Sequence, residues 1–219
     1  MLLYIMFFTG TLCIIGFSLF DKLMEYYNVE GRYYANHILA NGAIISLTWK
    51  NLYDCYFMRF HLDNTTTIYN AKSIIYGLHF YHMLMYRKKM RFDDWLHHGL
   101  MIGVSLPLTE MLPQTSILGH SMFFINGLPG MIDYALLFLV RNNYIAKSTE
   151  KSVNRLLNIW VRCPGCIATT CFILINIGKY YDILSTQQII SSIVMAGCVY
   201  WNGVYFMDQV VRNYAITTQ

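Results

Sequence analysis

Charged residues are scarce in this sequence. Only 13% of the 219 residues are Asp, Glu, Lys or Arg, whereas 56% are hydrophobic; a typical soluble domain is about one-quarter charged. A soluble globule of this size could not bury so much apolar surface and still cover itself with polar groups. The composition therefore excludes a disordered chain, a secreted disulfide scaffold and a soluble nucleic-acid-binding protein, and we expect no nucleic-acid partner.

Long polar linkers are also lacking, and the apolar residues gather instead in seven runs. Each run is long enough, at about 1.5 Å per helical residue, to cross roughly 30 Å of hydrocarbon. We therefore predict an all-α fold, a polytopic membrane helix bundle of about seven transmembrane helices that forms one domain over residues 1–219. The predicted spans are 2–20, 36–57, 67–86, 94–112, 116–140, 157–178 and 189–211.

Basic residues are rare on one side of this predicted bundle. Eleven Lys and Arg residues fall in the first, third and fifth connections and the carboxyl-terminal tail, whereas only Arg59 and Lys179 fall in the other connections. Basic residues accumulate on the cytoplasmic side of membrane proteins. The pattern predicts that the N-terminus is outside or lumenal and that the C-terminus is cytoplasmic.

Ionisable side chains inside a bilayer are costly, so those in the spans are functional candidates. Counting from the span ends brings eight of them to one level near the cytoplasmic side. Side chains at helix ends can also reach the headgroups without a functional role. His79 and His82 share a helix face because they are three positions apart. The eight are His37, His79, His82, His97, His98, Asp133, Arg162 and Asp208.

Polar residues also mark three other places in the spans. Asp54 and Lys72 lie toward the outer side, where they could form an ion pair. Asn126 and Asp133 share a face of the fifth span, which Pro129 should kink. We expect a polar stripe on the last span to face the bundle centre or a cavity; it consists of Trp201, Tyr205, Asp208 and Arg212.

The segment 87–98, RKKMRFDDWLHH, carries the strongest chemical signal. Asp93 or Asp94 can cap the following helix, and His97 and His98 then stand in its first turn. A neutral imidazole there can act as a base or a nucleophile. Adjacent helical residues are about 100° apart, so at most one of the two can point squarely at a shared substrate. A structural pair at the membrane interface is the alternative, and we expect no metal site.

The third span with its Tyr and His residues, the basic loop with an Asp, and the His-His pair together resemble the TLC-domain family, which includes the ceramide synthases. The resemblance is strongest over about 67–140 and extends by helix count to a core of about 36–212. It implies an endoplasmic reticulum protein with a lipid cavity that opens toward the cytosol and an active site at His97 and His98. The family's His-Asp-x-x-Asp motif is absent, since the next span offers only His120-Ser121 and Asp133; this favours a divergent branch.

Two functions follow as hypotheses. The first is an acyl-CoA-dependent lipid acyltransferase without a cofactor, in which His97 or His98 is the base or acyl carrier and Asp133 orients it. Arg87, Lys88, Lys89 and Arg91 would meet the acyl-CoA phosphates, although the same residues also serve as a topology signal. The second is a non-enzymatic lipid-binding, lipid-sensing or lipid-trafficking protein. Membrane lipids are the expected partners, and a homo-oligomer stays open. We assign substrate binding to His79, His82, Asn126, Arg162, Tyr205 and Asp208.

Overall fold

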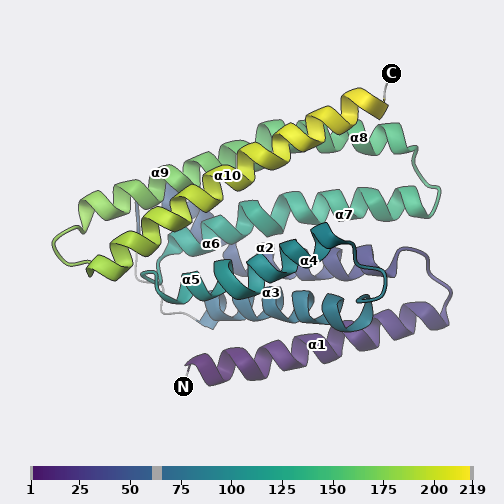
Figure 1. Ribbon diagram of the computed structural model, residues 1–219, viewed down its shortest axis with the longest axis horizontal. Coiled ribbons are helices and arrows are strands. Elements are labelled where there is room, and N and C mark those ends of the chain that lie inside the picture. Colours follow the sequence, from purple (N-terminus) through teal and green to yellow (C-terminus); the bar gives the residue numbers. More distant parts are fainter. Residues whose placement is uncertain (1, 61–65, 218–219) are drawn as a thin grey trace.

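The computed structural model describes residues 2–60 and 66–217, and this part of the chain is helical, with no strand. Successive helical rods run back and forth along one bundle (Figure 1). Three rods are single helices, namely α1 (Leu2–Tyr26), α2 (Arg32–Tyr56) and α3 (Thr66–Met85). The fourth comprises α4 (Phe92–Leu100), η1 (Met101–Ser105) and α5 (Leu106–Glu110). The fifth comprises α6 (Ser116–Met122), η2 (Phe123–Gly127) and α7 (Leu128–Arg141). The sixth comprises α8 (Lys147–Leu157), η3 (Asn158–Arg162) and α9 (Cys163–Lys179), and the last rod is α10 (Thr186–Thr217).

Four of these rods are long and apolar enough to cross a membrane, which is compatible with an integral membrane protein. They are Phe7–Tyr26, Ser116–Arg141, Lys147–Lys179 and Thr186–Thr217. The other rods are shorter or more polar. In α2 the polar side chains Asn36, Asn41 and Thr48 are buried, because this helix packs against α3, α6 and α7 at the centre of the bundle. Its low hydropathy therefore reflects a face turned toward protein rather than lipid.

Helix α1 packs along α3 through a glycine contact. A Cβ on Gly77 would lie 2.5 Å from Cys13 Cβ and 3.2 Å from the Gly10 carbonyl oxygen, which is closer than van der Waals contact. The absence of a side chain at Gly77 therefore lets the two backbones approach. Farther along, the Tyr81 and Tyr86 hydroxyls both donate to the buried Asp21 carboxylate, at 2.8 and 2.6 Å.

Three prolines, Pro107, Pro129 and Pro164, each follow a π-helical segment by two residues. A proline cannot donate a backbone hydrogen bond, and its ring clashes with the carbonyl four residues earlier. Widening the preceding turn relieves that clash. The widening is seen in the hydrogen bonds, since the residue after each π segment donates its N–H to the carbonyl five positions back, as Leu128 does to Phe123. The kink expected at Pro129 thus takes the form of a π-helical segment.

The expected pair between Asp54 and Lys72 is wrong. Lys72 is buried and donates instead to Glu110 Oε1 at 2.9 Å and to Gln114 Oε1 at 2.8 Å. The reason is orientation: the Lys72 side chain leaves α3 toward the fourth rod, whereas Asp54 belongs to α2. This buried ion pair joins α3 to the end of α5, away from the histidines.

Candidate functional site

Five histidines from three rods converge near one end of the bundle. They are His37 of α2, His79 and His82 of α3, and His97 and His98 of α4. The ring centroids of His37 and His82 lie 4.3 Å apart, those of His82 and His98 lie 5.4 Å apart, and those of His79 and His98 lie 4.9 Å apart. We call these five residues the histidine cluster.

The two adjacent histidines have different environments. His98 is buried at 5% exposure against His79 and His82, whereas His97 lies exposed on the fourth rod. This difference agrees with the expectation that only one member of the pair can face inward. Asp94 fixes the start of α4, since its carboxylate accepts the Arg91 backbone N–H at 2.8 Å. The side chain of Asp93, the other expected cap, lies outside the described residues.

The backbone determines which nitrogen of His79 is basic. Its Nδ1 lies 2.9 Å from the Ile75 carbonyl oxygen. A carbonyl oxygen only accepts, so Nδ1 of the neutral ring carries the hydrogen and Nε2 keeps the lone pair. That Nε2 is buried without a protein partner, as are His82 Nε2 and His98 Nδ1. The described residues contain no group of three His, Cys, Asp or Glu side chains that could hold a metal ion.

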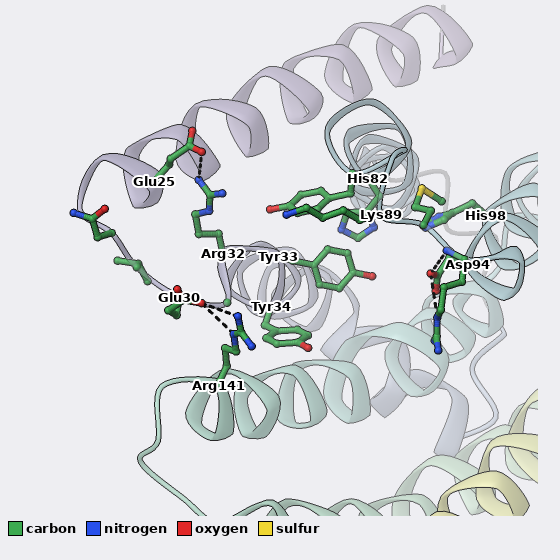
Figure 2. A pocket seen from close by; sticks show the side chains of 16 residues that line it. Glu25, Glu30, Arg32, Tyr33, Tyr34, His82, Lys89, Asp94, His98 and Arg141 are labelled. Atoms are coloured by element: carbon green, nitrogen blue, oxygen red, sulfur yellow. Dashed lines mark hydrogen bonds and ion pairs between the residues drawn. The ribbon is translucent and has the colours of Figure 1, made fainter.

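A polar cavity of about 770 Å³ opens beside the cluster (Figure 2). We call it the polar cavity; it lies among the α1–α2 connection, the end of α3, the start of α4 and the end of α7. His82 and His98 line it. All four basic residues expected to meet acyl-CoA are exposed. Lys89 and Arg91 line this cavity, whereas Arg87 and Lys88 do not.

Four tyrosines that the sequence analysis missed pack on the histidine cluster or line the polar cavity. Tyr33 stacks on His82 at a centroid distance of 4.3 Å, and Tyr134 stacks on His37 at 3.7 Å. Tyr34 and Tyr86 line the cavity as well. A signal was present, since Tyr33 and His37 are four residues apart and so share a helix face.

A narrow apolar crevice of about 80 Å³ lies between α3, the fourth rod, the fifth rod and α10. Ile75 and Met101 line it, one helical turn from His79 and His97 respectively. Asn126, expected to bind substrate, lines this apolar crevice rather than the polar cavity. Asn202 of α10 also lines it, and its Oδ1 is buried without a partner. The histidine cluster therefore lies between a polar cavity and an apolar crevice.

Asp133 is engaged elsewhere. Its Oδ1 accepts a hydrogen bond from Asn154 Nδ2 at 2.6 Å, and no described contact joins it to His97 or His98. The face of α7 that carries Asp133 turns to α8, while the next residue, Tyr134, faces His37. The expectation that this carboxylate orients an imidazole is therefore not met by the geometry.

Arg162 belongs to the same region as Asp133. It donates weakly to Asn158 Oδ1 at 3.5 Å, and its guanidinium lies 5.3 Å from the centroid of the Phe206 ring. The described residues contain no ion pair between Arg162 and Asp133 within 4.0 Å. Buried Glu150 lies beside these groups, paired with Lys151 at 3.2 Å. These residues form a second polar cluster, and Arg162 in it lies near enough to His97 for the two side chains to interact electrostatically.

The stripe on α10 does not face the bundle centre, so that expectation is wrong. Trp201 and Tyr205 are 57% and 42% exposed and stack on each other, and Asp208 pairs with Arg212 on the surface at 2.8 Å. The face of α10 that packs on α9 carries small residues instead, including Ala196 and Gly203. Bulky aromatic side chains are excluded from this close contact and point outward. Tyr205 and Asp208 therefore lie away from the histidine cluster.

Comparison of the chain with protein-family models, with curated proteins and with solved structures finds no match. The histidine cluster and the two spaces beside it are therefore the basis for a functional assignment. Together they offer imidazole lone pairs at a boundary between polar and apolar surroundings.

Proposed function

We propose that this chain is a seven-span membrane protein, similar to the TLC-domain family, that acts on a lipid at the cytoplasmic leaflet. Four rods are apolar enough to span, and the remaining rods run alongside them (Figure 1). The connections rich in Lys and Arg, between α1 and α2, α3 and α4, and α7 and α8, lie at the same end as the C-terminus. By the positive-inside rule this end is cytoplasmic, and an endoplasmic reticulum location accompanies the family resemblance.

One observation carries the proposal: along α3 and the fourth rod, the histidine cluster lies between residues that line the polar cavity and residues that line the apolar crevice. An amphiphile has the same division, with a polar headgroup at one end and hydrocarbon at the other. Its headgroup would lie beside His82 and His98, and its chain would extend past Ile75 and Met101. The crevice is narrow, so the fourth rod would have to move outward to admit a full chain.

The reaction we propose is acyl transfer from acyl-CoA. An imidazole lone pair, on His98 or on His79 Nε2, takes the proton from a hydroxyl or amine of the acceptor lipid. The oxygen or nitrogen attacks the thioester carbonyl, the carbon–sulfur bond breaks, and the coenzyme A thiolate leaves and receives the proton. Exclusion of water by the surrounding rods favours transfer over hydrolysis.

The test is acyl transfer by purified protein carrying His98→Gln or His97→Gln, with His120→Gln as control. His120 is buried too, but it binds Thr169 at 2.7 Å, away from the cluster. Removing a general base costs about 10²- to 10⁴-fold in rate. We expect that loss for His98→Gln, a smaller loss for exposed His97→Gln, and a nearly unchanged rate for the control. Full turnover in both the His97 and His98 variants, and in His79→Gln as well, would remove the mechanism.

A non-enzymatic lipid-binding protein is the second candidate. The hydrogen bond from Asn154 to Asp133 favours it, because this carboxylate then does not orient the imidazole of His97 or His98. In that case the cluster would recognise the headgroup without reacting with it. A lipid that co-purifies with the protein, together with no product on addition of acyl-CoA, would select this function over the first.

A further inference from the structure

The charged residues around the polar cavity nearly balance. Four cations line it, namely Arg32, Lys89, Arg91 and Arg141, together with three carboxylates, Glu25, Glu30 and Asp94. With the histidines neutral, the lining carries one net positive charge. Two further charged residues lie outside the cavity: Lys22 contacts Glu25, and Asp21 lies near Arg32. Their opposite charges cancel, so the net charge of the site stays the same.

Three of the cations are already paired. Arg32 contacts Glu25 at 2.8 Å, Arg141 contacts Glu30 at 3.0 Å, and Arg91 lies 3.8 Å from Asp94. Figure 2 shows the first two pairs at one side of the cavity and Asp94 with His98 at the other. Lys89 is the lining cation without an ion pair among the described residues.

The two histidines that line the cavity give a second observation that points to a ligand for this space. His82 and His98 line the cavity, are 1% and 5% exposed, and each has a buried ring nitrogen without a partner. A buried polar atom without a hydrogen bond is costly. A ligand with several oxygen atoms and hydrogen-bonding groups would satisfy these nitrogens and meet the Lys89 ammonium.

We infer that the polar cavity binds the phosphodiester headgroup of a membrane phospholipid, with Lys89 as the cationic contact. This inference rests on the proposed function and names the lipid class. A phosphodiester carries one negative charge, which equals the surplus on the lining. Coenzyme A carries several phosphate charges, which would need further cations, and Arg87 and Lys88 do not line the cavity. Acyl-CoA would therefore approach from outside this space.

The test uses full-length protein, reconstituted with mixed phosphatidylcholine and phosphatidylethanolamine plus diacylglycerol, purified, and analysed for bound lipid by mass spectrometry. Lys89→Gln is compared with Lys88→Gln, which removes the same charge from the neighbouring side chain; Lys88 is exposed as Lys89 is, but it does not line the cavity. We expect about one phospholipid per chain in the wild type and in Lys88→Gln. Retention should fall about five- to tenfold in Lys89→Gln, the loss of one charge-assisted contact, and Lys89→Arg should restore it.

Equal retention in the two glutamine variants would overturn the inference. So would displacement of the lipid by coenzyme A, or by inorganic phosphate, which would indicate a site for the free anion. Retention of diacylglycerol instead of phospholipid, with turnover still dependent on His98, would overturn the phosphodiester assignment and leave the proposed function standing. Absence of any retained lipid would overturn both.

Discussion

Single hydrogen bonds to backbone carbonyls set the chemistry of the histidine cluster. Nδ1 of His79 lies 2.9 Å from the carbonyl oxygen of Ile75, and Nδ1 of His37 lies 3.0 Å from that of Tyr33. Both rings therefore present Nε2 as the acceptor when neutral. Of these two rings, His79 also lies close to the adjacent pair: its ring centroid is 4.9 Å from that of His98 and 5.5 Å from that of His97. His79 is thus a candidate base of equal standing to His98.

Replacement of His79 by Gln should lower acyl transfer by about 100-fold, since the amide cannot act as a base. The free energy of unfolding should change by only about 1 kcal/mol, the value of one hydrogen bond. Turnover and thermal unfolding in detergent are the two measurements, with His120→Gln as the matched buried control. A loss of turnover that only parallels a loss of folded protein in both variants would contradict a chemical role.

The buried pair of Lys72 and Glu110 gives a prediction about stability. Lys72→Met leaves Glu110 without its cation, and breaking a largely buried pair from one side is destabilising. Since the Glu110 side chain is 28% exposed, we expect a loss of about 2 kcal/mol, seen as a lower melting temperature. Lys50→Met, at an exposed position of α2, should have little effect. If both variants melt alike, the pair contributes nothing to the fold.

The sequence predicts the depth of polar residues better than their direction. Counting along the spans brings His37, His79, His82 and His98 to one level, and the structure joins them. The same counting cannot fix rotation about the helix axis, which depends on packing partners. Asp133 consequently faces α8 instead of the histidines, and Tyr205 faces outward.

Among the elements, the contact between α9 and α10 depends on a glycine. A Cβ on Gly203 would lie 2.7 Å from Cys166 Cβ and 3.4 Å from Cys163 Cα, whereas one on Gly197 meets nothing within 4 Å. Both glycines belong to α10. They therefore form a matched pair for testing how closely the last two rods pack.

Gly203→Ala should destabilise the protein by about 1–3 kcal/mol, because the added methyl group forces the helices apart. Gly197→Ala should be neutral or stabilising by up to about 1 kcal/mol, since alanine favours the helix. Melting temperatures of the two variants in the same detergent decide the matter. Equal destabilisation would show that the close approach of α9 and α10 is absent in the membrane protein.

The proline-linked π segments show a second limit of sequence reasoning at this scale. Pro129 predicts a disturbance of the fifth rod, and a disturbance is found. The hydrogen-bond pattern that accommodates it depends on neighbouring turns, so the π segments before Pro107 and Pro164 were not foreseen. The apolar crevice is lined by residues of two such segments, η1 and η2, including Met101 and Asn126.

At the scale of the whole molecule, apolar runs in the sequence correspond to all the rods, although their ends differ. The sixth rod begins at Lys147 rather than near 157, because the amphipathic α8 extends the helix with a polar face. The cavities could not be predicted in this way. They arise where rods distant in sequence fail to close on each other, as α3 and α10 do beside Ile75 and Met195.

The division of the molecule into polar cavity, histidine cluster and apolar crevice can be tested with one measurement. A phospholipid with a photoactivatable diazirine midway along one acyl chain is added to the reconstituted protein, and crosslinked residues are mapped by mass spectrometry. We predict crosslinks to the crevice residues Met101, Ile125 and Met195, which decrease when Lys89 is replaced by Gln. Crosslinks confined to outward-facing residues such as Trp160 and Trp201, with none in the crevice, would contradict a lipid bound across the histidine cluster.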